Sequence, residues 1–166
     1  MSDVNLRESL LIAIDTERKG QELYKELENR FADKDSEISL IFHQLAKDEK
    51  KHERFFHSLL VDAPTTPEGE VHSRDAEFLK AATISRFFER SSEELARSIE
   101  SVENALTLAF QFEKTTLMFY LALDEVIGRQ EQALAEVIHA EKEHMNTLMK
   151  IILTEARFRG LGDQWW

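Results

Sequence analysis

Two Glu-x-x-His motifs are the part of this 166-residue sequence with the clearest capacity for chemistry. One is formed by Glu49 and His52, and the other by Glu141 and His144. Residues three apart on a helix lie on the same face about one turn from each other, so the carboxylate and imidazole of a motif can bind one cation. The carboxylate can also bridge to a second cation. The two motifs therefore predict ligands for divalent metal ions.

Two isolated glutamates accompany these motifs, each within a heptad pattern of apolar residues. Alternating steps of four and three along residues 6–31 give a mostly apolar stripe with Glu17 near its middle. The same steps along residues 102–127 place Glu113 at the corresponding point. An apolar stripe of this kind faces the core of a helical bundle. The pattern thus predicts that both carboxylates point inward.

The motifs and the isolated glutamates are related by an internal repeat. An offset of 96 relates the first long stretch to the third (113 − 17 = 96), and an offset of 92 relates the second to the fourth (141 − 49 = 92). The matching pairs are Glu17 and Glu113, Tyr24 and Tyr120, Glu49 and Glu141, and His52 and His144. Two hairpins are too few for a solenoid. The repeat instead predicts a four-helix bundle with pseudo-twofold symmetry.

The elements that must position these residues form an all-α fold. Two prolines and five glycines provide too few turns for a many-stranded β protein, and 42% apolar residues are too many for a disordered chain. We expect a single domain over residues 1–166. Its expected parts are a helical hairpin at 3–61, a crossover with a short extra helix at 62–100, a second hairpin at 101–159 and a tail at 160–166.

The crossover and the tail are less regular than the hairpins. The short helix of the crossover is expected at about 75–89, where apolar residues recur at helical spacing. Four serines in and after the crossover are candidates for helix N-caps: Ser91, Ser92, Ser98 and Ser101. The terminal Trp165 and Trp166 are expected to dock on the bundle or to form a dimer contact.

Four carboxylates in one core need a compensating positive charge, because burying a bare carboxylate costs several kcal/mol or more. No lysine or arginine occupies the same heptad register. We therefore expect a site for two divalent ions. Its expected ligands are Glu17, Glu49, His52, Glu113, Glu141 and His144. Oxygen-rich ligands with two imidazoles favour iron or manganese, and zinc is also compatible with them.

Other residues are candidates to support these ligands. Tyr24 and Tyr120 follow the isolated glutamates by two turns in both repeats, so a supporting or redox role beside the metal stands as an equal alternative to a packed aromatic with a satisfied hydroxyl. Asp48 could accept the imidazole N–H of His52 or of His144. The repeat position of Asp48 is occupied by alanine, so this support is one-sided.

Composition excludes several other classes of function. The net charge of −11 argues against binding to nucleic acid or to an anionic membrane. The absence of cysteine excludes disulfides, a thiol nucleophile and any iron centre held by thiolates within this sequence. No apolar run is long enough to predict a transmembrane helix, and no secretory signal is recognised. We expect a soluble cytoplasmic protein.

The combination of both Glu-x-x-His motifs with Glu17, Tyr24, Glu113 and Tyr120 resembles the ferritin-like di-iron carboxylate proteins, and among them the rubrerythrin family. The resemblance implies a ferritin-like bundle with two iron ions, bridged by Glu49 and Glu141, with the other two glutamates terminal. It also implies reduction of hydrogen peroxide or dioxygen in the response to oxidative stress, and a homodimer. Bacterioferritin is similar, but its haem-binding Met is replaced here by Lys50.

Two departures from the family pattern affect the expected function. Full-length rubrerythrins carry a Cys-rich domain that delivers electrons, so an external electron-donor protein is expected here. Rubrerythrins also tend to have a further glutamate where this chain has Thr116. Three alternatives therefore remain: iron oxidation and storage in a ferritin-like cage, a non-catalytic bundle with a polar seam, and a membrane-associated hydroxylase whose apolar face would lie around Phe78, Phe87 and Phe88.

Overall fold

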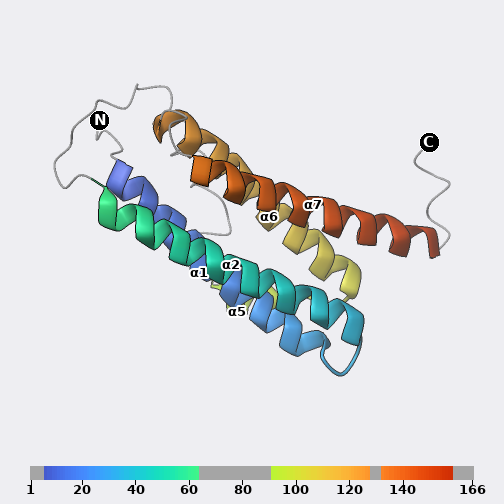
Figure 1. Ribbon diagram of the computed structural model, residues 1–166. Helices are drawn as coiled ribbons and strands as arrows, with labels where there is room; N and C mark the ends of the chain where they lie inside the picture. Colours follow the sequence, from blue (N-terminus) through green and yellow to red (C-terminus); the bar gives the residue numbers. More distant parts are fainter. Residues whose placement is uncertain (1–5, 64–90, 128–131, 159–166) are drawn as a thin grey trace.

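The computed structural model describes residues 6–63, 91–127 and 132–158, and these form an all-α, ferritin-like bundle. Four long helices make two hairpins, with one short helix beside them (Figure 1). No strand occurs within the described ranges. The helices are α1 (Leu6–Phe31), α2 (Ser36–Asp62), α5 (Ser92–Arg97), α6 (Val102–Ile127) and α7 (Gln132–Phe158).

The bounds of the long helices agree with those expected wherever the structure describes them. Helix α2 begins at Ser36 and ends at Asp62, one residue after the expected end of the first hairpin at 61. Helix α6 ends at Ile127 as expected. The helix expected at 75–89 and the tail with both tryptophans lie outside the described residues.

Helix α5 was not anticipated as a separate element. Its start is a capping box, in which the Ser91 side chain accepts from the Glu94 backbone N–H and the Glu94 side chain accepts from the Ser91 N–H. Ser101 also acts as an N-cap, since its Oγ accepts from Asn104 N at 3.1 Å. The other two expected caps are wrong. Ser92 Oγ donates to Lys19 O, and Ser98 Oγ donates back to Leu95 O at the end of α5.

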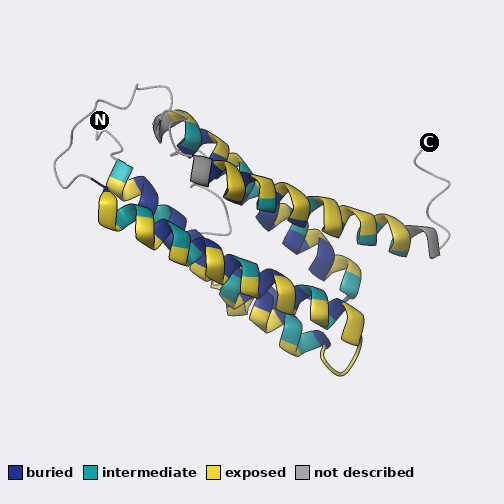
Figure 2. Cartoon of the chain, in the orientation of Figure 1, coloured by how far each residue is buried: buried dark blue, intermediate teal, exposed yellow. Residues whose placement is uncertain are grey.

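Two hydrophobic clusters fill the bundle, one on each side of its middle. The first surrounds Tyr24, Phe42 and Phe112, and the second surrounds Phe56 and Tyr120. Buried residues line the inner faces of the long helices, whereas the outer faces are exposed (Figure 2). Between the clusters, every long helix contributes buried polar residues. The apolar packing thus leaves one polar layer at mid-height.

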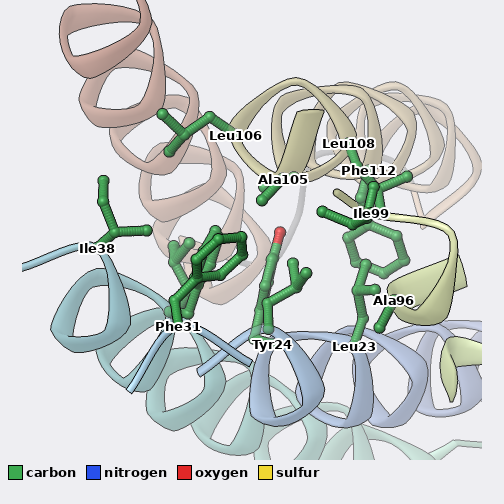
Figure 3. Close-up of a cluster of buried hydrophobic side chains, with 14 of the residues drawn as sticks. Leu23, Tyr24, Phe31, Ile38, Ala96, Ile99, Ala105, Leu106, Leu108 and Phe112 are labelled. Carbon is green, nitrogen blue, oxygen red and sulfur yellow. The ribbon is translucent and has the colours of Figure 1, made fainter. Parts of the chain in front are cut away.

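Helix α5 closes one side of the first cluster. Its Ala96 and the following Ile99 pack beside Leu23 of α1 and Phe112 of α6 (Figure 3). Ser92 Oγ binds the α1 backbone at Lys19 O over 3.0 Å. These contacts cover the α1 side of the bundle close to the polar layer.

Within the described ranges, no helix is long and apolar enough to cross a membrane.

The N-cap of α2 gives a test of how this hairpin is stabilised. Asp35 Oδ1 accepts from Ile38 N at 3.1 Å. Asp35→Ala removes this acceptor and is expected to lower the free energy of unfolding by about 1 kcal/mol, measured by urea denaturation. Asp33→Ala is the control, because Asp33 lies exposed in the same turn. Equal losses in both variants would assign the effect to charge and contradict the capping role.

Candidate metal centre

The structure brings all six expected ligand residues together in the polar layer. Glu17 comes from α1 and Glu113 from α6, and the two Glu-x-x-His motifs come from α2 and α7. The four glutamates are completely buried, at 0% exposure, whereas His52 is 8% and His144 9% exposed. Heptad spacing accounts for this convergence, because each residue lies on the inward stripe of its helix.

The six residues form two overlapping groups, each compact enough to surround one ion. In each group the candidate ligand atoms lie within 4.8 Å of one another. Position 1 consists of Glu17, Glu49, His52 and Glu141, and position 2 consists of Glu49, Glu113, Glu141 and His144. Glu49 and Glu141 belong to both positions. This sharing agrees with the bridging role that the family resemblance implies for them.

The unpaired polar atoms of this layer fit a pair of bound cations. The buried atoms without a hydrogen-bond partner include Glu17 Oε2, both Glu49 carboxylate oxygens, His52 Nδ1 and Glu141 Oε1. His52 Nδ1 lies 3.0 Å from Glu141 Oε1 without hydrogen-bond alignment. Buried polar atoms in proteins are almost always paired. Carboxylate and imidazole atoms left unpaired around one volume are the donors that iron or manganese takes.

The charges of the glutamates lead to the same conclusion. Burial and then the neighbouring carboxylates raise the pKa of Glu17, Glu49 and Glu113 well above the ordinary value. Burial acts in the same direction on Glu141, but contacts with Glu113 and both histidines outweigh it and lower its pKa. No lysine or arginine of the described residues forms an ion pair with these glutamates. Additional positive charge is needed to keep all four ionised.

Both tyrosines bind the carboxylate of the opposite hairpin. Tyr24 OH of α1 donates to Glu113 Oε1 of α6, and Tyr120 OH of α6 donates to Glu17 Oε1 of α1. Burial, followed by the nearby carboxylates, raises the pKa of both hydroxyls, so they remain donors. These bonds satisfy both hydroxyls, and the supporting role beside a metal stays a prediction. Each tyrosine orients the glutamate that belongs to only one of the two positions.

Asp48 contacts His144 rather than His52. Its Oδ2 lies 3.6 Å from His144 Nε2, while His144 Nδ1 faces Glu113 Oε2 at 3.4 Å. The contact with His144 is the main cause that holds the pKa of Asp48 below its ordinary value. The structure thereby selects one of the two partners that the sequence left open.

Two further residues of the layer contact the shared glutamates: Gly20, which was not identified from the sequence as part of the site, and Thr116, which was identified only as a departure from the family pattern. A Cβ on Gly20 would lie 2.7 Å from Glu49 Oε2 and 2.7 Å from Phe112 Cε1, so only glycine leaves space for this carboxylate. Thr116 occupies the repeat position (20 + 96 = 116), and its Oγ1 lies 3.3 Å from Glu141 Oε2. Both positions fall on the heptad stripe, which was the available signal.

The destabilising effect of the buried carboxylates can be measured in the metal-free protein. Glu49→Gln removes one carboxylate whose two oxygens both lack partners. At pH 8 we expect the free energy of unfolding of this variant to be roughly 1–3 kcal/mol higher than that of the metal-free parent, because the variant lacks one unsatisfied buried charge. Metal addition should then stabilise it less than the parent. Glu22→Gln, at an exposed position of α1, is the control. A less stable Glu49→Gln protein would contradict this account.

Gly20→Ala tests the space beside Glu49. In an exposed helix this change stabilises by about 1 kcal/mol. Here we expect a loss of about 1–3 kcal/mol, because the added methyl group overpacks against Glu49 and Phe112. Urea denaturation of the metal-free protein measures the sign of the change. Thr107→Ala, at an exposed site on α6, should show only the effect of helix propensity. A gain in both variants would contradict the close contact.

Comparison with known proteins adds one positive finding. A search of curated proteins and a search of solved structures each returned no match. The model of the family described as Rubrerythrin matches residues 8–152, which include all four long-helix segments that supply the layer. Together with the buried cluster of glutamate and histidine, this match identifies a candidate metal site of the di-iron carboxylate kind. The chain belongs to the rubrerythrin family.

Proposed function

We propose that this protein is a di-iron oxidoreductase that reduces hydrogen peroxide or dioxygen with electrons from an external donor. The observation that carries the proposal is the set of unpaired carboxylate and imidazole atoms buried between two apolar clusters. A purely structural bundle has no need of four such glutamates, because apolar residues of similar volume would pack there at lower cost.

The proposed ligands of two iron ions are the six residues of positions 1 and 2, with Glu49 and Glu141 common to both. Iron is proposed over manganese or zinc because of the family to which the chain belongs. When bound there, two ferrous ions would supply the two electrons that, with two protons, convert one peroxide into two waters.

The protein's own residues hold and enclose the reacting centre. The hydroxyl protons of Tyr24 and Tyr120 are held at Glu113 Oε1 and Glu17 Oε1, where they keep these carboxylates in place. Apolar clusters above and below the layer exclude bulk water. Of the six ligands only the two histidines, on α2 and α7, reach the surface at all, with 8% and 9% exposure. A small oxidant is therefore proposed to approach between α2 and α7.

The source of electrons must differ from a rubredoxin-type centre within these 166 residues, because they contain no cysteine. We propose an electron-donor protein as the source. A homodimer is the proposed assembly, as the family resemblance implies, and each chain of it would contain a complete set of six ligands.

Anaerobic metal loading followed by oxidation tests the proposal. The metal-free protein should bind two ferrous ions per chain, and stopped-flow mixing with hydrogen peroxide should oxidise both rapidly. His144→Ala should lose one bound ion and most of the oxidation, whereas His139→Ala, an exposed residue on the same helix, should behave like the parent. Peroxide reduction would be refuted if peroxide failed to oxidise the fully loaded ferrous protein. It would also be refuted if an added reductant gave no repeated turnover.

Thr116 gives a reason to test iron oxidation and storage as a second function. This residue is buried and carries a hydroxyl where rubrerythrins tend to carry another carboxylate. Storage needs a hollow oligomer, whereas reduction of a small oxidant does not. Analytical ultracentrifugation should therefore show a dimer. A large cage that takes up many iron ions per chain would favour storage instead.

A further inference from the structure

We propose that positions 1 and 2 bind their ions with unequal affinity, and that Asp48 is the positioning residue that causes the difference. Position 2, which contains His144, should fill first, and position 1, which contains His52, should fill second. The inference rests on the proposed metal site. It goes further by assigning an order of binding to two positions that the repeat makes look equivalent.

The imidazole of His144 is held from both sides. Its Nδ1 faces Glu113 Oε2 at 3.4 Å, and its Nε2 faces Asp48 Oδ2 at 3.6 Å. Asp48 is itself fixed, because Gln44 Nε2 donates to it over 2.9 Å and Lys51 Nζ over 2.5 Å. Asp48 thus lies at ion-pair distance from the outer nitrogen of the ring, while Nδ1 is directed toward the carboxylates.

The imidazole of His52 has ion-pair contacts through one nitrogen only. Its Nδ1 lies 3.0 Å from Glu141 Oε1 and 3.5 Å from Glu17 Oε2. No hydrogen bond or ion pair joins its Nε2 to another described residue. The repeat explains this difference, because the position that corresponds to Asp48 is 48 + 92 = 140, and residue 140 is alanine.

The rest of the layer is matched between the two positions. Glu17 and Glu113 each accept a tyrosine hydroxyl from the opposite hairpin. A further break in the repeat, Gly20 against Thr116, touches Glu49 and Glu141, which both positions share. Neither difference favours one position directly. Asp48 is therefore the group that distinguishes the surroundings of His144 from those of His52.

A carboxylate that accepts the outer N–H of a ligating histidine orients the ring and makes its other nitrogen a better donor. Removing such a partner typically weakens metal binding about 10–100-fold. We therefore expect the dissociation constants of the two positions to differ by roughly that factor. At one ion per chain, most occupied molecules should hold a single ion at position 2.

Titration of the metal-free protein with Mn²⁺ alone tests this order without any turnover. Calorimetry should resolve two binding phases, and electron paramagnetic resonance should show isolated manganese first and coupled pairs only in the second phase. His52→Ala should remove the weak phase and retain the tight one. His144→Ala should remove the tight phase. These two variants identify which position each phase represents.

Asp48→Ala and Ala140→Asp test the cause. The first should weaken the tight phase about 10–100-fold and bring the two constants together, and the second should tighten the weak phase. Asp15→Ala removes an exposed carboxylate of α1 and should change neither phase. Urea denaturation without metal shows whether each variant folds, which is expected because Asp48 and Ala140 are only partly buried.

The outcomes separate this inference from the function on which it rests. Failure of the parent to bind manganese or ferrous iron would overturn the metal site itself. Two ions bound with equal affinity would leave the site standing and overturn the inference. Unequal phases that persist unchanged in Asp48→Ala would overturn the role of Asp48.

Discussion

The mutual repulsion of four glutamates in one buried layer is the constraint on which this structure depends. Two apolar clusters pack the helices above and below this layer, and caps define the starts of α2 and α5. The carboxylates must be kept apart and oriented, and their negative charge must be compensated. Neighbouring side chains contribute to each of these requirements. Two tyrosines fix one pair, a glycine leaves space for one shared carboxylate, and two histidines lie at the side that is partly open to solvent.

The heptad pattern and the repeat predict the layer well, because both are properties of single helices. A residue on the inward stripe at mid-length will lie at mid-height in any bundle of these helices, so Glu17 and Glu141 could be assigned to a common layer before their contacts were known. Helix α5 could not be found this way, since six residues are too few for a periodic pattern. Its capping box, Ser91 with Glu94, was the local signal that was available.

Contacts between helices were not predictable to the same degree. Tyr24 and Glu113 are 89 residues apart, and their pairing depends on the antiparallel passage of α1 beside α6. Similarly, Asp48 lies at ion-pair distance from His144 and not from His52 of its own helix, because the stagger of α2 against α7 brings Oδ2 to the opposite imidazole. The space at Gly20 depends on the ring of Phe112 on another helix. Sequence periodicity contains no information on stagger or on such close approaches.

The crossed tyrosine bonds and the shared glutamates mean that neither hairpin contains a complete site. A chain with only one such hairpin could assemble the same layer by pairing with an identical copy, and the present chain has the geometry of that pair joined into one polypeptide. In a pair of identical copies, symmetry would give both histidines the same neighbour. Joining the copies removes that restriction, since each half can then change alone. Asp48 facing one histidine, with alanine at the matching place, is a difference that only the joined form can encode.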